Sequence, residues 1–538
     1  MSGIFFADVF ANPSRLGLTV LVVSGLFLLV RLSKSKARLS DIPAVGDATS
    51  KEARRKEFLS GKARDLYVEG YKKFKDSAFR IMTARQSECV VVSPEFLKHL
   101  KRLPEDVLSF NEAALQTKYT NITSNIPTIP HTLKTSLNPA LFRLNPIILD
   151  EVSNAIQTEF PQSADWSDVR INGKLARIVA KTSGRIFVGP DLCRDEVYLD
   201  AAVNYTLDMT AAIQAVGFIS SWLRPFLASR APQVKKLYHR FQQADDFLRP
   251  VVTARRQAAI NGLNEKNKPD DMLQWLMDSQ DKFGQQSDRA ISKYQLSLTF
   301  AAIHTTTAAL TNAFYNLAAT PDLVVTLRQE VEEVLAETNL NITAVSLQKM
   351  VKLDSFLKEI MRYYPQSATA FQRKVMKPVT LPNGQAIPPG VILEVPSHAI
   401  NYDGTIHTNP DVFDAMRFYK IRKEKEAALR SKMSAEDAFT EAATNNQFAS
   451  VGDTSLAFGY GRNACPGRFF AANETKMILA TTFLKYDLKM PDGYTERYTN
   501  LTFGSQVCIT HSTFKNQLMI PSQSVPDPTK TIMMRLRN

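Results

Sequence analysis

The sequence predicts a mainly α-helical globular chain with small β-sheets, held behind a single N-terminal membrane anchor. Long stretches repeat apolar residues with helical spacing, and the longest uninterrupted one runs from Ile291 to Leu317. The stretches typical of β-strands are short and bounded by turn residues. Near the N-terminus, an apolar stretch without charges lies between Arg15 and Arg31. Together these patterns indicate a helical protein attached to a membrane.

The apolar stretch from Leu16 to Val30 is short for a membrane span and within the length of a signal-peptide core. Basic residues follow it where a signal peptide would carry its cleavage site, which favours an anchor over a signal peptide or a buried helix. The positive-inside rule places the rest of the chain in the cytosol, and the endoplasmic reticulum membrane is thin enough for a short span. We expect a lumenal segment at 1–15, a transmembrane anchor at 16–32, a basic linker with Pro and Gly at 33–50, and a globular domain at 51–538.

The composition is that of a globular protein, with 44% hydrophobic and 22% charged residues and a formal net charge of +13. The basic residues are interspersed with acidic ones and form no arginine-rich face, so nucleic acid is not expected as a partner. A membrane surface or an acidic protein partner accounts for the excess positive charge. The four cysteines show no CxxC or zinc-finger spacing, so neither a disulfide framework nor structural zinc is indicated.

Periodicity and turn signals give the individual elements of the globular domain. Helices are predicted at Lys51–Phe79, Asp200–Leu263, Ile291–Leu317, Lys352–Tyr364 and Arg468–Lys485. Strands are predicted at Cys89–Val92, Gln366–Val375 and Val379–Leu393. The second helical region is interrupted by the apolar segment Phe218–Leu227, which either packs on the core or contacts a membrane or ligand. The long polar segment Arg417–Ser455 is expected to be exposed to solvent.

The segment Phe458–Gly467, FGYGRNACPG, carries the strongest chemical signal. Its glycines permit positive φ and close passage of the backbone past a flat group. Cys465 directly precedes a helix start, where free N–H groups and the helix dipole stabilise a thiolate. A thiolate on such a loop is a suitable ligand for haem iron. The alternatives are a small buried cysteine, or a loose dinucleotide fingerprint at 459–464, which would need a second βαβ unit that the sequence lacks.

This loop resembles the haem-binding loop of the cytochrome P-450 monooxygenases. Other motifs of that family lie before this loop, in the order in which the family has them. Phe300–Thr307 resembles the oxygen-activating helix, and Glu359-x-x-Arg362 with Arg417 resembles a buried ion network that supports the cysteine loop. The resemblance implies a haem-thiolate monooxygenase fold for the domain at 51–538, haem b as cofactor, and Cys465 as axial ligand of its iron.

On the oxygen side of the haem, the resemblance assigns proton delivery to Thr305. The sequence departs from the family pattern in two places, since Ala302 replaces a glycine and His304 replaces a carboxylate. Because histidine also transfers protons near neutral pH, we expect His304 to take part with Thr305 in catalysis.

The resemblance also implies residues that hold the haem. Arg373 matches a position that reaches a haem propionate, while Asn463 stands where the family usually has Arg or His. Neighbouring Arg462 is therefore a candidate substitute. In the family, a helix at the place of Pro127–Asn145 supplies a Trp and an Arg to a haem propionate. This sequence has no such pair there, and His131 and Lys134 are the nearest polar candidates. The full set of expected cofactor-binding residues is Cys465, Arg373, Arg462, Phe458, Gly461, Gly467 and Lys134.

The resemblance further implies an apolar substrate. The pocket residues expected from it are Phe300, Ala301, Ala368, Thr369, Ala370 and Phe371. Within the family, the helix and loop motifs are most similar to fungal secondary-metabolism enzymes, including the ent-kaurene-oxidase-like group. This predicts insertion of one oxygen atom from O2 into a C–H bond of a terpenoid or meroterpenoid. The alternatives are oxidative desaturation or multi-step oxidation of a polyketide or other natural product, a non-oxygenating haem-thiolate isomerase or dehydratase, and a haem-binding sensor or scaffold.

No flavin or nicotinamide domain is visible in the sequence, so the electrons must come from a separate protein. The resemblance implies an NADPH-cytochrome reductase, with cytochrome b5 as a second electron donor. The basic residues Arg462, Arg468 and Lys476 lie near the cysteine in sequence and could meet an acidic partner surface, although solvated charge is an equal explanation.

Overall fold

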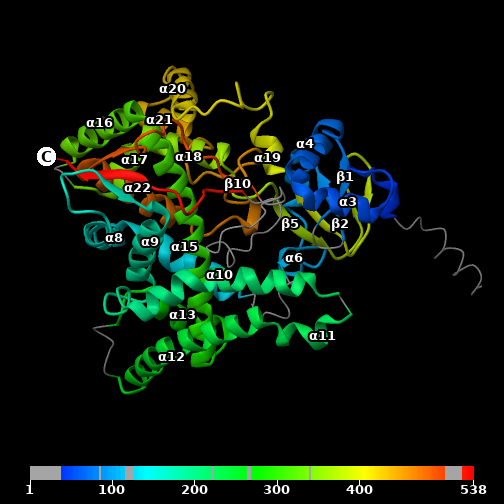
Figure 1. Cartoon of the computed structure of the whole chain (residues 1–538), viewed down its shortest axis with the longest axis horizontal. Coiled ribbons are helices and arrows are strands. Elements are labelled where there is room, and N and C mark those ends of the chain that lie inside the picture. The colour runs from blue at the N-terminus through cyan, green and yellow to red at the C-terminus, as the bar shows by residue number, and fades with distance from the viewer. Residues whose placement is uncertain are drawn as a thin grey trace, which may run out of the picture.

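The computed structural model describes residues 38–83, 87–114, 126–220, 222–262, 268–338, 341–502 and 524–537. These residues form a mainly helical protein with four small β-sheets, which confirms the predicted secondary-structure class (Figure 1). The predicted lumenal segment and membrane anchor, 1–15 and 16–32, lie outside the described residues. Within the described ranges, none of the helices combines the length and the apolar character needed to cross a membrane.

The helices and strands have the following bounds. The first helices are α3 (Lys51–Glu57), α4 (Ala63–Lys73), α5 (Leu97–Leu100), α6 (Phe110–Ala114), α7 (Thr128–Thr132), α8 (Asn138–Glu159), α9 (Ile171–Phe187), α10 (Glu196–Phe218), α11 (Arg224–Leu227), α12 (Pro232–Ile260), α13 (Met272–Asp278) and α14 (Gln280–Phe283). They are followed by α15 (Asp288–Ala319), α16 (Pro321–Glu337), α17 (Ala344–Lys349), α18 (Val351–Tyr363), α19 (Ser397–Asn401), α20 (Arg417–Leu429), α21 (Ala435–Ala443) and α22 (Arg468–Lys485). The strands are β1 (Ala78–Met82), β2 (Glu88–Val92), β3 (Leu108–Ser109), β4 (Ser167–Val169), β5 (Ala370–Val375), β6 (Val379–Thr380), β7 (Ala386–Ile387), β8 (Ile392–Val395), β9 (Tyr486–Lys489), β10 (Leu501–Thr502), β11 (Ser524–Val525) and β12 (Ile532–Leu536).

The largest sheet joins two distant parts of the chain in the order β1-β2-β8-β5-β3. β2 pairs in parallel with β8, and the other neighbouring strands pair antiparallel. The predicted strand at Cys89–Val92 is confirmed as β2, and the two later predicted strands contain β5 and β6–β8. This sheet joins β5, which carries Arg373, to β1–β3 from the N-terminal part of the chain. Strands β1–β3 and helices α3–α6 are called the N-terminal lobe below.

The helix predicted over Lys51–Phe79 ends earlier than expected. A π-helical turn with Gly61 at φ 107° divides it into α3 and α4, and Phe79 belongs to β1. After α4 the chain turns back, and α4 packs on β1. This close packing requires Gly70, because a side chain there would overlap the Phe79 ring. Within the predicted linker, Ile42 and Val45 are buried, and Val45 N–H donates to the Arg80 carbonyl.

The main hydrophobic core lies between α8, α9, α15, α16, α18 and α22. α15 runs through the middle of the molecule and confirms the long helix predicted at Ile291–Leu317 (Figure 1). Its second half is buried nearly all round, which is typical of a central helix. The helix predicted after the cysteine is α22, and its packing on α8 places the cysteine loop at the edge of this core.

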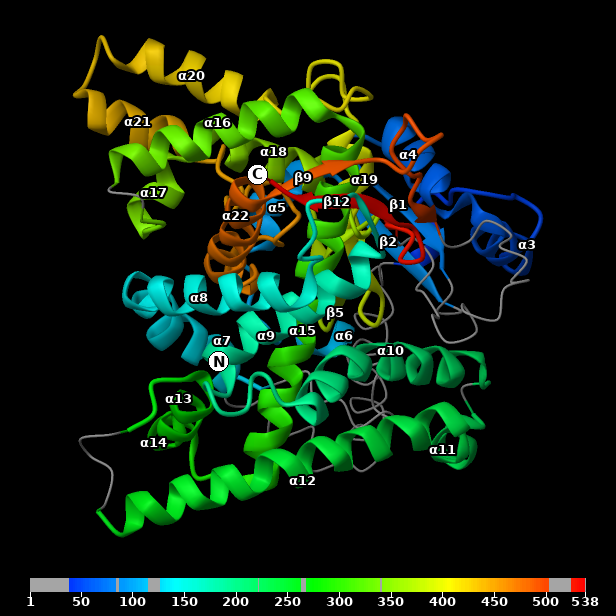
Figure 2. The ribbon, with the colours of Figure 1, turned by 60° about the vertical axis from the view of Figure 1, so that its left-hand side comes forward.

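α10 and α12 pack on each other and on α15, and α11 connects them. The predicted interruption is therefore confirmed. Around α11, Trp222 and Phe226 are 74% and 66% exposed. In Figure 2 this layer lies at the opposite end of the molecule from α20 and α21.

The segment Arg417–Ser455 was predicted to be exposed, and this prediction is wrong in part. It forms the helical hairpin of α20 and α21, in which Arg422 and Glu426 are buried. Ala438 and Ala442 are fully buried on α21. Arg422 and Glu426 are buried because α21 covers this side of α20. The Arg422 guanidinium lies over the Phe439 ring, and Glu426 pairs with Lys423 and Arg430.

Candidate active site

The cysteine loop is closed by its own backbone. Cys465 N–H donates to the Phe458 carbonyl at 2.8 Å, and the Phe458 ring packs edge-on against Phe448 at 5.4 Å. Gly459 and Gly461 have φ of 73° and 72°, which confirms the predicted left-handed positions. Gly467 has φ −87°, so its conformation does not require glycine. Among the described residues, no heavy atom would lie within 4 Å of a Cβ at Gly467, which leaves that side of the loop open to a flat group.

Cys465 differs from the other described cysteines because its side chain is exposed, whereas Cys89 and Cys193 are buried. The surrounding protein atoms raise the pKa of the Cys465 thiol. The backbone N–H groups of Gly467 and Arg468 and the Arg468 guanidinium act against this and lower the pKa. The Arg468 guanidinium also donates to the Cys465 carbonyl at 2.8 Å. The thiol is therefore accessible, and its pKa is raised overall, with the N–H groups at the helix start opposing the rise.

Glu359, Arg362 and Arg417 meet in a buried ion network. Both oxygens of Glu359 accept from Arg362 at 2.8 Å and from Arg417 Nε at 3.1–3.2 Å. The backbone N–H of Asp414 adds a third donor at 3.0 Å. The remaining guanidinium N–H groups bind backbone carbonyls between Asn401 and Val412. α18 is thereby tied to the segment that leads into α20.

A second group of α18 side chains holds the segment before the cysteine loop. Lys358 Nζ donates to the carbonyls of Asn445 and Gln447, both at 2.9 Å. Asp354 accepts from Phe448 N–H at 2.8 Å and pairs with Lys476 of α22 at 2.5 Å. Lys476 is buried, so the expectation that it faces an electron-donor protein is wrong.

Arg373 is buried without a carboxylate. Its guanidinium donates to the Gln372 carbonyl at 2.7 Å and to Asn463 Oδ1 at 3.2 Å, and it stacks on the rings of Phe371 and Phe110. Burial lowers its pKa to about 10, so it stays charged at neutral pH. In the part of the chain that the structure describes, no acidic side chain forms an ion pair with it, although the Glu105 carboxylate acts on it electrostatically and opposes the lowering of its pKa. Because a buried cation needs a counter-charge, this position fits an anionic group such as a haem propionate.

The other two basic residues expected at the cofactor lie differently. Arg462 is exposed and donates to the Leu103 carbonyl in the N-terminal lobe, and Lys134 is exposed on the turn between α7 and α8. Asn463, which the sequence presents as a departure from the family pattern, is the residue that contacts Arg373. Asn138 at the start of α8 donates to the Pro466 carbonyl at 3.2 Å. That contact had no sequence signal because it joins residues far apart in the chain.

On α15, Thr305 and Ala301 are exposed and lie one turn apart. The Thr305 hydroxyl donates back to the Ala301 carbonyl at 2.9 Å, as expected for threonine within a helix. Gln366 donates from its amide to the Thr305 carbonyl at 2.9 Å. The same face therefore presents a hydroxyl and a small apolar side chain.

His304 points to a neighbouring helix. Its Nε2 lies 2.8 Å from the carbonyl oxygen of Val203 in α10. Burial lowers the pKa of His304, which favours the neutral ring. Since a carbonyl only accepts, Nε2 carries the proton and donates. The structure thus places Thr305 on an open face and His304 in a helix–helix contact.

The expected pocket residues divide into two groups. Phe300 is half-buried and meets Tyr205 edge-on at 6.3 Å, and Phe371 is buried with φ 54°. Ala368, in contrast, belongs to a core cluster of the N-terminal lobe. The Thr369 hydroxyl donates to Glu394 at 3.3 Å, so that side chain is also directed into the lobe. Phe300, Ala301 and Ala370 are the better candidates for contact with a substrate, because Phe371 also belongs to a core cluster and stacks on Arg373.

Comparison with known proteins agrees with this geometry. Residues 59–514 match the family described as Cytochrome P450. The chain is 36% identical over 455 residues to cytochrome P450 monooxygenase ATR3 of Stachybotrys chlorohalonatus, covering 84% of this chain and 89% of that protein. It is 33% identical to cytochrome P450 monooxygenase BOA4 of Botryotinia fuckeliana, over 93% of this chain and 96% of the relative.

A third relative, cytochrome P450 monooxygenase paxP of Penicillium paxilli, is 31% identical over 84% of each chain. The family match spans the helix with Thr305, the ion network of Glu359 and the cysteine loop in one continuous region. The exposed thiol of Cys465 and the buried guanidinium of Arg373, which forms no ion pair with a described residue, both fit the cofactor that the family implies. The chain therefore belongs to the cytochrome P450 family and is a cytochrome P450 monooxygenase.

Proposed function

We propose that this enzyme uses haem b, bound through Cys465, to insert one oxygen atom from O2 into a C–H bond of an apolar secondary metabolite. The observation that carries the proposal is the exposed Cys465 on its glycine loop, before the start of α22. The family match supplies the reaction class, and the substrate class is our inference.

Haem supplies the activation of O2 when it is bound with a thiolate ligand. Cys465 would be that ligand, and Arg373 with Asn463 would bind a propionate. The loop of Phe458, Gly461 and Gly467 would lie along the haem. Thr305 would hold a water molecule with its hydroxyl and transfer a proton from it, because its side chain is exposed on α15.

The proposed substrate is a terpenoid or meroterpenoid. Apolar side chains at Phe300, Ala301 and Ala370 favour a hydrocarbon skeleton over a polar one. The terpenoid class rests on the resemblance of the helix and loop motifs to fungal secondary-metabolism enzymes. Screening of terpenoids alongside polyketides would assign the class directly, and product masses would distinguish hydroxylation from desaturation and from repeated oxidation.

The proposed electron donor is an NADPH-cytochrome reductase, with cytochrome b5 as a second donor. The proposed location is the endoplasmic reticulum membrane, with the anchor at 16–32 and the catalytic domain in the cytosol. The exposed apolar residues Trp222 and Phe226 support contact of the domain with lipid, because exposed aromatic clusters bind membranes or ligands.

Two measurements test the proposed function. The reduced protein with carbon monoxide should show the strongly red-shifted Soret band of thiolate-bound haem, and Cys465→Ser should lose it. A band at the position of histidine-bound haem in the wild type would refute the ligand assignment.

With reductase and NADPH, Thr305→Ala should lower product formation by about 10²-fold, the usual contribution of a positioned proton donor, and raise peroxide release. A reaction indifferent to this substitution would instead indicate an isomerase or dehydratase that does not activate oxygen.

A further inference from the structure

α15 contacts α10 at two successive turns. Phe300 meets Tyr205 edge-on, and one turn later His304 Nε2 lies 2.8 Å from the Val203 carbonyl. Both helices also pack against α12, so the contact sits inside a three-helix layer (Figure 2). His304 is thus a polar contact between the two helices, beside the apolar contacts of Leu296 and Phe300 with α10, and Tyr198 of α10 and Thr299 of α15 are a second pair of polar neighbours.

The chemistry of this contact argues against proton transfer through it. The carbonyl of Val203 can accept the hydrogen bond but has no proton of its own to pass on. A proton relay through His304 Nε2 would therefore end in the backbone of α10. The neutral ring that burial favours is, however, well suited to a permanent hydrogen bond.

The next residue, Thr305, is held from a different direction. Gln366 donates to its carbonyl, and the Gln366 carbonyl in turn accepts from Ser524 N–H at 3.3 Å. Two consecutive residues of α15 are therefore fixed by two separate parts of the chain. α10 fixes His304, and the segment that precedes β5 fixes Thr305.

We propose that His304 is a positioning residue that couples α10 to the Thr305 turn of α15. Through the bond to Val203, a shift of α10 changes the position of Thr305. This inference rests on the proposed function only in giving Thr305 the proton-delivering role. It replaces the proton-transfer role that the sequence suggests for His304.

Two substitutions of His304 separate positioning from proton transfer. In His304→Gln, the amide nitrogen of glutamine is three bonds from Cβ, as Nε2 of histidine is, so it can reach the Val203 carbonyl. In His304→Asn the amide is one carbon shorter and cannot. Neither side chain titrates. His304→Met fills the space of the ring but has no hydrogen-bond donor, so it also lacks the bond to Val203. With two variants that lack this bond, poor folding of one does not decide the result.

The first readout is hydrogen–deuterium exchange of α10 in the full-length, haem-loaded protein, without substrate or turnover. Loss of one hydrogen bond should make exchange around Val203 about fivefold faster in the Asn and Met variants. The Gln variant should exchange as the wild type does. Equal exchange in all four proteins would overturn the proposal.

The second readout is NADPH oxidation and peroxide release with purified reductase between pH 6 and 8. Positioning predicts that His304→Gln keeps the wild-type pH profile, while the Asn and Met variants release more peroxide per NADPH. If the Gln variant fails as the other two do, His304 transfers protons and the proposal is wrong. A wild type that oxidises no substrate would contradict the proposed function, and the exchange experiment would still decide the role of His304.

Discussion

At the scale of single residues, Glu359 has the most demanding environment near the cysteine loop. Its carboxylate is fully buried and accepts from two guanidinium groups and a backbone N–H. The two arginines use their other donors on carbonyls of the segment before α20. Removing one charge would leave the remaining ones buried and uncompensated, so the network behaves as a unit.

We predict that Glu359→Gln destabilises the fold by roughly 3–5 kcal/mol, the usual cost of breaking a buried ion pair. Because the network supports the scaffold of the cysteine loop, the variant should also lose haem. Thermal unfolding and the carbon monoxide spectrum measure the two effects. Glu337→Gln is the matched control, since Glu337 is exposed in its pair with Lys349. Normal haem content in Glu359→Gln would contradict the prediction.

The sequence identified the residues of this network because their spacing is local or belongs to a known motif. It could not identify the contacts of Gln366 with Thr305 or of His304 with Val203, which depend on how α15 packs against other elements. It also misplaced Lys476, because a lysine beside a cysteine loop usually faces solvent. Burial of that lysine depends on Asp354, which lies far away in the sequence.

At the scale of elements, α18 organises the approach to the cysteine loop. One side of it carries Glu359 and Arg362, and Asp354 and Lys358 hold the backbone between Asn445 and Phe448. Lys358 is buried, and burial lowers its pKa to about 8. Its ammonium group binds two carbonyls and stacks on the Phe418 ring of α20. This lysine therefore links α18, α20 and the chain leading to the cysteine.

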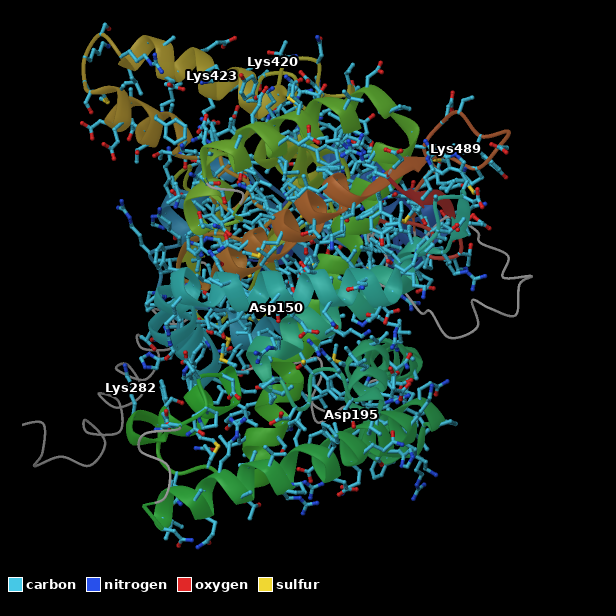
Figure 3. The ribbon with its side chains drawn as sticks, turned by 90° about the vertical axis from the view of Figure 1, so that its left-hand side faces the viewer. Asp150, Asp195, Lys282, Lys420, Lys423 and Lys489 are labelled. Atoms are coloured by element: carbon cyan, nitrogen blue, oxygen red, sulfur yellow. The ribbon has the colours of Figure 1, made fainter. Side chains whose placement is uncertain are left out.

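We predict that Lys358→Met lowers the stability by about 3 kcal/mol, because two buried carbonyls lose a charged donor. The fraction of haem with the thiolate-type carbon monoxide spectrum should fall as well, since the Phe448 segment packs on Phe458. The same substitution at Lys420, which Figure 3 shows on α20 and which is exposed, should change stability by about 0.5 kcal/mol or less. Equal effects at both positions would contradict the structural role of Lys358.

The sequence predicted the long helices, the interruption around α11 and the main strands, because their apolar periods are strong. It failed where tertiary packing overrides local pattern. α4 ends early because β1 folds back over Gly70, and the charged α20 is partly buried because α21 covers it. In both cases the deciding partner is a neighbouring element rather than a residue in the same window.

At the scale of the whole molecule, buried histidines set the response to acid. Burial lowers the pKa of His398 to about 3 and that of His407 to about 4, and nearby arginines add to the effect at His407. In the unfolded chain both groups have a pKa of about 6.5. Below that pH, both histidines bind protons in the unfolded state but remain neutral in the native state, so the free energy of unfolding falls as the pH falls. The net charge of +13 adds to the effect because further positive charge opposes the compact state.

We predict that His407→Leu loses less stability than the wild type when the pH is lowered from 7.5 to 5.0. The buried Nε2 of His407 has no hydrogen-bond partner among the described residues, so leucine removes the titration without breaking a bond at that atom. After allowance for partial exposure, the difference should be on the order of 1 kcal/mol. Denaturant unfolding of both proteins at the two pH values measures it. If acid destabilises both proteins equally, His407 is already protonated in the native state, or another group governs the acid response.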